Sequence, residues 1–453
     1  MKNFVLIALG FLFTVNSFSQ KDDSLMIKKI SDEILTNGKA YDNLRTLTKN
    51  IGGRLAGSPQ MLLAEQWGEK LMKESGADKV IMQECKVPHW VRGGRDMAKV
   101  KGKNKDLDVV ALGNSMGSGK KGVTAQVLLI NSFDELEKKK DDVKGKIVFY
   151  NYKFNPTFVQ TFRSYGDASP YRGNGPSRAA KYGAKAVIVR SMSHSVDNNP
   201  HTGATRYVDS FPKIPAVAIG LRDADWLADE LQKTSLSVEI KTYGHFLDSA
   251  TGHNVIGELT GSEFPNEIIT VGGHLDSWDN GEGAHDDGAG CVQTIEILRT
   301  FKALGYRPRR TIRFVLFANE ENGLRGGNKY ADEAKAKNEK HIFALESDAG
   351  GFTPRAFGFT MSDEQFQKVL QWKPLIAPYG CSEFNRGGGG ADIGPLRRVF
   401  PTTALAGLSP DSQRYFDLHH ARNDVFEAVN KRELELGAVN MAALIYLIDK
   451  YGL

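Results

Sequence analysis

The sequence predicts an α/β protein in which a mixed, mainly parallel sheet is covered by helices and carries an inserted small β-rich module. Two observations predict this fold. After residue 250, apolar strand patterns alternate with helical patterns, which is typical of a mainly parallel sheet. Between residues 108 and 243, short apolar runs alternate with polar, Gly-rich or Pro-containing stretches. We therefore expect a main domain over 20–107 and 244–453, interrupted by a module over 108–243.

The length and composition suit a protein with a large core. The chain has 453 residues, of which 41% are hydrophobic and 25% are charged. The formal net charge is +5, and the basic residues are scattered along the chain without a dense stripe. Nucleic acid is therefore not expected as a partner.

The first 19 residues have the pattern of a cleaved signal peptide. Lys2 gives a positive start, an apolar run follows over 4–15, and Ser17-Phe18-Ser19 forms a small-x-small cleavage signal before Gln20. The apolar run is shorter than the roughly 20 residues that span a bilayer, although a retained membrane anchor is the alternative. We expect cleavage near Ser19-Gln20, a secreted or periplasmic protein, and no stable membrane insertion.

The segment before the module predicts two helical regions and a strand. Residues 24–50 are polar with scattered apolar positions and favour a helix that ends at Gly52-Gly53. Ser58 is of the residue type that caps helices, so a second helix is expected to run to about Ser75. A strand should follow over 79–91. The apolar face of the second helix is expected to hold Leu62, Leu63, Trp67 and Leu71.

The module over 108–243 is predicted from short apolar runs that have the length of buried strands. These runs are 109–112, 125–130, 146–150, 184–189 and 214–220. One or two helices are expected beside them. Gly113–Gly122 lacks the spacing of a phosphate-binding loop, because Lys120 is followed by Lys121 rather than by Ser or Thr. The stretches expected to be loops are 113–122, 151–180 and 191–213.

The part after residue 250 predicts strands and helices in alternation. The expected strands are 267–273, 311–318, 341–347 and 399–406. The expected helices are 287–304, 328–336 and 431–450. This order indicates that several strands run parallel and that their carboxyl ends meet at one edge of the sheet.

Three cysteines, Cys85, Cys291 and Cys381, are too few for a disulfide scaffold. If the protein is exported to an oxidising compartment, one disulfide can form. A disulfide between Cys85 and Cys381 is possible, but the spacing of the cysteines does not support it. Cys291 follows a Gly-rich helix start and is expected to be a buried free thiol.

Five clusters of histidines and carboxylates carry the chemistry of the chain. Four of them lie where strands end or where a helix begins, and ligands bind at that edge in open α/β sheets. Each cluster alone would be explained by structural or solvated residues, but together they predict a metal site. The clusters lie at 273–276, 284–290, 317–323, 345–350 and 419–424.

The residue types in these clusters favour catalytic zinc, because histidines and carboxylates occur without thiolates. The adjacent carboxylates Asp286-Asp287 would repel each other at a helix start unless a cation and the helix dipole compensate. In Glu320-Glu321, one glutamate can ligate a metal while its neighbour faces the metal-bound water. Two histidines and three carboxylates are too many for one open zinc site and suffice for two metals that share one carboxylate.

These motifs resemble peptidase family M28, whose members are co-catalytic zinc peptidases, and within it the carboxypeptidase Q type. The module over 108–243 resembles a protease-associated (PA) domain, on residues 143–148 and 179–184. The resemblance covers nearly all of the chain after the signal peptide and implies the zinc exopeptidase fold of the phosphorylase/hydrolase-like class. The residues that carry it are 273–279, 283–288, 319–323, 346–350, 391–393 and 416–420.

The resemblance implies a role for each residue of the site. Asp286 would bridge the two metals, and Glu320 would act as general base. Asp276 would orient His274 without binding a metal itself. The residues implied to hold two zinc ions per chain are His274, Asp286, Glu321, Asp348 and His420.

His420 is preferred to its neighbour His419, because family members commonly have His-x-x-x-Asp here, which His420 and Asp424 match. The family often has Gly-Asp-Thr around this aspartate, whereas this chain has Asn423-Asp424-Val425. That departure leaves the implied ligand in place and puts the shape of the local turn in doubt.

The resemblance implies an exopeptidase that cuts dipeptides or short peptides with a free N-terminus, with a water between the metals as nucleophile. A homodimer is implied in the same way. The alternatives are a zinc-free receptor or scaffold, a single-zinc aminoacyl cyclase, and a C-terminal exopeptidase. The complete ligand set argues against the first and the PA-like module against the second. The glycine run Gly387–Gly390 is either a flexible loop or a wall beside the substrate.

Overall fold

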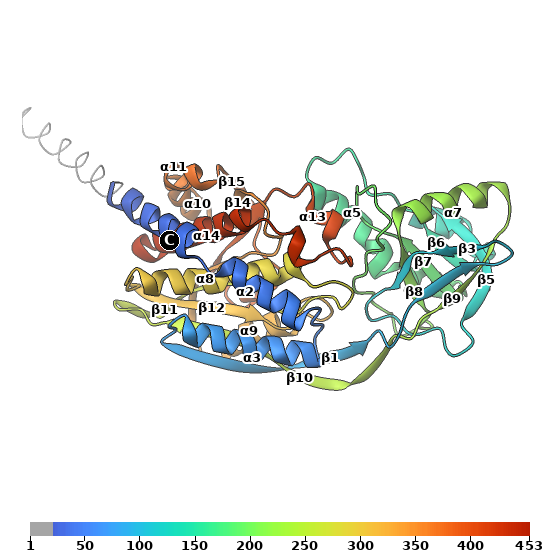
Figure 1. Cartoon of the computed structure of the whole chain (residues 1–453), viewed down its shortest axis with the longest axis horizontal. Helices are drawn as coiled ribbons and strands as arrows, with labels where there is room; N and C mark the ends of the chain where they lie inside the picture. Colours follow the sequence, from blue (N-terminus) through green and yellow to red (C-terminus); the bar gives the residue numbers. More distant parts are fainter. Residues whose placement is uncertain (1–20) are drawn as a thin grey trace, which may run out of the picture.

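The chain forms two eight-stranded sheets, which lie end to end and are joined by two long strands (Figure 1). This computed structural model describes residues 21–453. The predicted signal peptide over 1–19 and its cleavage site at Gln20 lie outside the described residues. Within residues 21–453, no helix combines the length and the apolar character needed to cross a membrane.

The first sheet is formed by the predicted α/β part of the chain. Its central strands run parallel to one another, whereas the β1–β10, β10–β12 and β14–β16 pairs are antiparallel. The predicted mixed, mainly parallel sheet is therefore confirmed. Its strand order is β1 (Lys79–Val91), β10 (His245–Leu259), β12 (Arg310–Phe317), β11 (Phe264–His274), β13 (Lys340–Glu346), β16 (Ala404–Pro410), β14 (Pro354–Thr360) and β15 (Glu383–Arg386).

Helices cover both faces of this sheet. One face packs against the helix over 21–37, α3 (Pro59–Glu74), α8 (Ala289–Ala303) and α14 (Lys431–Tyr451). The other face packs against α9 (Arg325–Ala336) and α12 (Gly394–Val399). The central strand β12 is buried from both sides, which explains its unbroken apolar run. Shorter helices complete this part: α2 (Ala40–Thr46), η1 (Leu47–Ile51), α10 (Asp363–Leu370), α11 (Lys373–Ile376), η4 (Ala377–Tyr379), α13 (Tyr415–Leu418) and η5 (Phe426–Ala428).

The second sheet lies between β1 and β10 in the sequence, and those two strands connect it to the first (Figure 1). Its strand order is β3 (Lys105–Leu107), β2 (Met97–Val100), β9 (Ser237–Lys241), β5 (Val123–Ile130), β6 (Ile147–Tyr150), β7 (Ala186–Arg190), β8 (Ala216–Ile219) and β4 (Val109–Ala111). Its helical segments are α4 (Phe133–Lys138), η2 (Lys140–Asp142), α5 (Thr161–Gly173), α6 (Gly175–Lys181) and α7 (Leu221–Lys233).

The module differs from its prediction in two respects. Its sheet begins at Met97 rather than near residue 108, because β2 pairs antiparallel with β9. Four α-helices accompany the sheet, where one or two were expected, and two of them, α5 and α6, occupy the predicted loop over 151–180. Pro170 lies inside α5, and glycines interrupt its apolar pattern, so the sequence there has the composition of a loop. The likeness of the module to a PA domain stays a prediction.

The helix α3 begins after Ser58, as predicted, and the Ser58 side chain accepts a hydrogen bond from the Met61 N–H. Its predicted apolar face is wrong in part, because the Leu62 and Leu63 side chains are each 51% exposed. The buried face of α3 is formed by Met61, Ala64, Glu65, Gly68 and Met72 instead. A Cβ at Gly68 would lie 2.7 Å from Leu316, so the helix approaches the sheet too closely for large side chains there.

Two other predicted elements have different limits. The helix over 24–50 is interrupted near Gly38, where the helix over 21–37 ends and α2 begins at Ala40. The strand predicted over 399–406 starts only at Ala404, because α12 runs to Val399 and a turn with Pro401 follows.

The three cysteines are all buried and free. Cys85 and Cys381 do not pair, and Cys291 is the buried thiol that the sequence predicts. Its thiol donates a weak hydrogen bond to the His274 carbonyl oxygen at 3.0 Å. The cysteines therefore belong to the packing of the core.

Candidate metal centre

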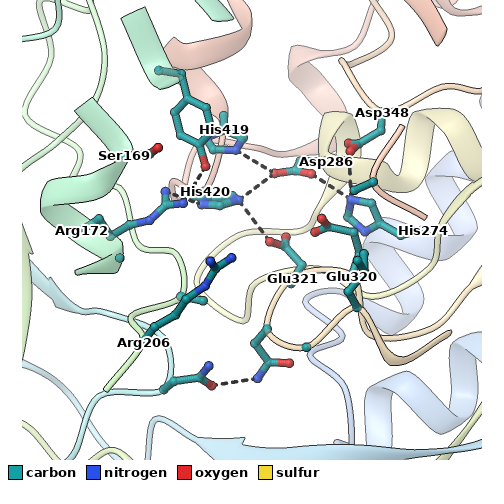
Figure 2. A pocket seen from close by; sticks show the side chains of 18 of the residues that line it. Ser169, Arg172, Arg206, His274, Asp286, Glu320, Glu321, Asp348, His419 and His420 are labelled. Atoms are coloured by element: carbon teal, nitrogen blue, oxygen red, sulfur yellow. Dashed lines mark hydrogen bonds and ion pairs between the residues drawn. The ribbon is translucent and has the colours of Figure 1, made fainter. Parts of the chain in front are cut away.

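The parallel strands of the first sheet bring the predicted site residues to one edge. His274 is the last residue of β11, Glu320 and Glu321 follow β12, and Asp348 follows β13. Asp286 lies in the irregular turn η3 (Ala284–Gly288), which precedes α8. The remaining predicted ligand, His420, comes from the loop after α13. Figure 2 shows that all of these side chains point into one space.

Asp286 lies between two groups of side chains (Figure 2). On one side, the Nε2 atom of His274 is 3.3 Å from Asp286 Oδ1 and 3.4 Å from Asp348 Oδ1. On the other side, the Nε2 atom of His420 is 3.3 Å from Asp286 Oδ2 and 3.1 Å from Glu321 Oε2. Each side of Asp286 therefore has one histidine and one further carboxylate, which is the arrangement that two metals sharing a carboxylate require.

Both histidines turn their Nε2 atoms toward these carboxylates. His274 Nδ1 is 2.9 Å from the Asp276 carbonyl oxygen, and His420 Nδ1 is 3.2 Å from the Thr202 carbonyl oxygen. A carbonyl can only accept, so the contact of His274 requires a proton on its Nδ1 atom, whereas His420 Nδ1 also lies 3.3 Å from the Arg172 Nη1 donor. Each Nε2 atom faces two carboxylate oxygens at 3.1 to 3.4 Å, so either a proton or a metal cation must lie between them.

The carboxylates also lack donors of their own. The buried oxygens Asp286 Oδ2 and Glu321 Oε1 accept no hydrogen bond from any described residue. Burial lowers the pKa of His274, but the neighbouring Asp348 and Asp286 carboxylates outweigh it and raise that pKa well above its usual value. Burial raises the pKa of Glu320 to about 8, and the nearby Asp348 carboxylate adds to this rise. The site therefore has an excess of negative charge that divalent cations would neutralise.

The neighbour His419 is placed less well for a metal. Its Nε2 atom is 3.6 Å from Asp286 Oδ2, and within residues 21–453 it forms no second ion pair with a carboxylate. Its ring stacks on that of His420, with centroids 3.5 Å apart, and packs against Tyr165 and Phe416. Burial lowers the pKa of His419 to about 3, which keeps its ring neutral. The geometry thus favours His420, the residue preferred from the sequence.

Asp276 supports the site differently from the prediction. Its main-chain carbonyl, rather than its carboxylate, faces His274 Nδ1, since the nearest carboxylate oxygen is 3.8 Å away. The carboxylate instead accepts hydrogen bonds from the backbone N–H groups of Glu320 at 2.9 Å and Glu321 at 3.3 Å. Asp276 therefore fixes the turn that carries both glutamates.

Two further residues hold the segment between His274 and Asp286. The Asp424 carboxylate accepts hydrogen bonds from the backbone N–H groups of His285 at 2.8 Å and Asp286 at 3.1 Å. The fully buried Arg54 donates to the carbonyl oxygens of Leu275, Glu282 and Gly283. Asp287 accepts from the backbone N–H groups of His274 and Gly290 with its two oxygens, and its carboxylate lies within 4.8 Å of ligand atoms of His274 and Asp348.

The glycine run at 387–390 serves close packing rather than flexibility. A Cβ at Gly390 would lie 2.0 Å from the Glu346 carboxyl carbon, and one at Gly388 would lie 2.7 Å from the Gly358 backbone. The run thus packs against β13 and β14, while Ala391 after it lines the cavity at the site. The wall beside the cavity therefore begins just after the glycines.

The site opens into a cavity of about 730 Å³. The second-sheet module forms the opposite wall, and the sequence did not predict its residues. Arg172 of α5 reaches His420, with its Nη1 atom 3.3 Å from His420 Nδ1, and Arg206 points into the same space (Figure 2). The only signal for this wall is the polar, aromatic stretch over 151–180, which has the composition of a loop and was predicted as one.

Comparison with known proteins gives consistent matches. Residues 254–445 match peptidase family M28. Carboxypeptidase Q of Bos taurus is 33% identical over 411 residues, which cover 90% of this chain and 85% of that protein. The crystal structure of a peptidase M28 precursor from Shewanella amazonensis SB2B has a TM-score of 0.90 at 31% identity, covering 95% of this chain and 97% of that one. BSAP, a zinc aminopeptidase from Bacillus subtilis, shares the fold with a TM-score of 0.65 at 22% identity. The match covers 91% of this chain and 95% of that one.

Proposed function

Because the chain belongs to peptidase family M28 and is a metallopeptidase, we propose that it is a co-catalytic di-zinc exopeptidase. Its substrates are dipeptides or short peptides with a free N-terminus. The observation that carries this proposal is the position of Asp286 between two matching groups, His274 with Asp348 and His420 with Glu321. Oxygen and imidazole ligands without thiolates suit zinc at a catalytic centre.

The donor set fits two zinc ions for reasons of charge and geometry. Imidazole Nε2 atoms and carboxylate oxygens face one another at 3.1 to 3.4 Å, a spacing suited to an ion between them. Asp286 Oδ2 and Glu321 Oε1 accept no hydrogen bond from any described residue. When bound, the two ions would supply Lewis acidity for the peptide carbonyl and a water of lowered pKa.

Glu320 is the general base of this proposal. Its side chain points into the cavity beside the ligands (Figure 2), and the Asp276 carboxylate fixes its backbone. The Glu320 carboxylate takes a proton from the water that attacks the peptide carbonyl and then gives it to the leaving amine. A water molecule is consumed, and the C–N bond breaks without a covalent intermediate on the protein.

The charge of the cavity supports cleavage next to a free N-terminus. The acidic wall presents the carboxylates of Asp286, Glu320, Glu321 and Asp348 to the entering substrate. A free amino end is attracted to this wall, whereas an acylated end loses that attraction. The relatives named carboxypeptidase Q and aminopeptidase leave the direction of cleavage to be measured.

The proposal also includes location and assembly. The pattern at Ser19-Gln20 supports export, so the mature protein would be secreted or periplasmic. The module between β1 and β10 acts as a PA-like domain that lines the substrate cavity, and two copies form a homodimer. Mass spectrometry of the exported protein tests the cleavage site, and sedimentation of the purified protein tests the dimer.

The experiment that tests the proposed function is hydrolysis of Ala-Leu and N-acetyl-Ala-Leu, with and without a chelator. We expect cleavage of the free dipeptide, little cleavage of the blocked one, loss of activity with chelator, and recovery with added zinc. Equal cleavage of the blocked dipeptide would identify a C-terminal exopeptidase instead. Full activity after removal of all metal would overturn the metal-dependent mechanism.

A further inference from the structure

The cavity has two walls of opposite charge. The strand ends of the first sheet supply four carboxylates, and the module supplies two guanidinium groups, those of Arg172 and Arg206 (Figure 2). These walls come from parts of the chain that are far apart in the sequence. A ligand that fills the space between them meets an acidic, metal-binding surface at one end and a cationic surface at the other.

Arg172 is a fixed part of the cationic wall. Its Nη2 atom donates to the Tyr165 hydroxyl at 2.6 Å, and its Nη1 atom donates to the Thr202 carbonyl oxygen at 3.5 Å. Its Nε atom is buried and has no hydrogen-bond partner among the described residues. Arg172 therefore places a positive charge beside His420 and keeps one donor unused.

Arg206 differs from Arg172 because its backbone is held while its guanidinium is free. Its N–H donates to the Gly173 carbonyl oxygen at 2.8 Å, and its carbonyl oxygen accepts from the Ser177 hydroxyl at 3.2 Å. Within residues 21–453, its guanidinium forms no hydrogen bond or ion pair, although it lines the cavity. A guanidinium has five N–H donors in a planar fork that matches a carboxylate. Arg206 thus presents a complete, unused carboxylate-binding group at the site.

We propose that Arg206, with the charge of Arg172 behind it, binds the C-terminal α-carboxylate of the substrate. This inference rests on the proposed function and specifies its substrate class: dipeptides bound as zwitterions, with the amino end at the acidic wall and the carboxylate at Arg206. Each added residue would move the carboxylate by roughly 3.5 Å, so tripeptides and longer peptides lose this contact. A cavity of about 730 Å³ is in the size range of sites for small ligands.

The test compares Ala-Leu with Ala-Leu-amide in the wild type and in Arg206→Ala. The amide lacks the negative charge and is otherwise the same size. For Ala-Leu, we expect Arg206→Ala to lower kcat/KM by about 10- to 100-fold, mainly through KM, since one charge-assisted contact is lost. For the amide, the wild type should already be slow, and the variant should change it little. Arg206→Lys should restore part of the activity on Ala-Leu.

Controls separate this role from folding and from metal binding. Arg355→Ala removes an arginine that is 59% exposed and that does not line the cavity, so it should leave both substrates unaffected. Zinc content and Tm of Arg206→Ala should match the wild type, because the residue is exposed and its side chain forms no hydrogen bond or ion pair with the described residues.

Several outcomes would overturn the subsite. Equal losses on Ala-Leu and its amide, or no loss on either, would exclude recognition of the α-carboxylate. If Arg206→Ala affects only Ala-Glu-amide, the arginine binds an acidic side chain and the assignment is wrong. A zinc-loaded wild type that cleaves neither Ala-Leu nor longer free peptides would overturn the proposed function, and this subsite with it.

Discussion

The imidazole rings of His274 and His420 illustrate how single hydrogen bonds prepare a metal site. Each ring has its Nδ1 atom near a backbone carbonyl, which favours a proton on that nitrogen and a free Nε2, although the Arg172 Nη1 donor also approaches His420 Nδ1. The free nitrogens face Asp286 from both sides. For His274, the tautomer that leaves Nε2 free for a metal is favoured by a backbone oxygen outside the ligand set.

At this scale, we predict that Glu320→Gln retains zinc and loses turnover. An amide has nearly the size of the carboxylate but cannot take up the proton of the attacking water. Since general base catalysis contributes about 10²- to 10⁴-fold, kcat should fall by a factor in that range. Zinc is measured by elemental analysis, and Glu84→Gln, an exposed change on β1, serves as control. Near-normal hydrolysis by Glu320→Gln would remove Glu320 from the base role.

A second prediction separates the neighbouring histidines. His420→Ala should reduce bound zinc towards one ion per chain, because the Nε2 atom near Glu321 and Asp286 is lost. His419→Ala should keep most of the zinc, because this ring faces only Asp286, at 3.6 Å. Elemental analysis of both variants checks this, and the reverse pattern would show that His419 is the ligand.

At the scale of elements, parallel strands determine where the chemistry gathers. β11, β12 and β13 run side by side in the same direction, so that His274, Glu321 and Asp348 meet although 74 positions separate the first from the last. The Asp276 carboxylate then fixes the turn after β12 through two backbone hydrogen bonds. Strand direction gives the common edge, and turn hydrogen bonds give the orientation of each side chain.

At the edge of the sheet away from the site, a half-buried ionic group connects β12 to the residue before β13. Glu339 accepts hydrogen bonds from Arg313 at 2.7 and 3.0 Å and lies 2.9 Å from His341 Nε2. Burial raises the pKa of Glu339, but the bonds from His341 and Arg313 outweigh it and lower that pKa to about 2. Because the folded pKa is depressed, the ionised carboxylate stabilises the fold above the unfolded value of about 4.3.

This pair of strands gives the third prediction. Glu339→Gln should lower the free energy of unfolding at pH 7 by roughly 2–3 kcal/mol. The difference from the wild type should shrink as the pH falls from about 4.3 towards about 2, since the wild-type carboxylate is then protonated too. Denaturant unfolding across this pH range measures the effect, with Glu84→Gln as the exposed control. A constant difference at every pH would contradict the role of the charge.

At the scale of the whole molecule, the site depends on two modules that share one cavity. The long strands β1 and β10 pair antiparallel along their length and extend from the first sheet to the second (Figure 1). The module contributes α5 and the loop at 202–206 to the cavity at the site. Arg172 of α5 thereby lies 3.3 Å from His420, measured between its Nη1 atom and His420 Nδ1. The metal ligands and the cationic wall therefore belong to different modules.

The fourth prediction concerns the metal and the stability of the whole protein. A chelator should lower Tm, because ions that bind only the folded state stabilise it by about 2.7 kcal/mol when free metal is 100 times its Kd. Glu320→Gln should show the same shift, whereas Asp286→Ala, which loses the shared ligand, should show little. Differential scanning calorimetry with and without chelator measures this. An unchanged Tm after complete removal of zinc would contradict the link between metal and fold.

Much of the architecture could be predicted from local patterns. The strand over 79–91, the cap at Ser58 and the C-terminal helix agree with the structure, because each depends on periodicity and on a few neighbouring residues. The prediction was wrong where packing overrides the pattern. Leu62 and Leu63 are exposed because the face of α3 that packs on the sheet runs through Met61, Ala64 and Gly68, and they lie outside it.

The sequence by itself determined which residues could form the site, since apolar strands that end in His274, Glu320-Glu321 and Asp348 are local features of the chain. Only the tertiary structure decided that Asp286 lies between two groups, that Asp276 holds the glutamates, and that Arg206 faces them across the cavity. The physical reason is that these relations depend on side-chain direction and on contacts between distant segments, neither of which any local pattern contains.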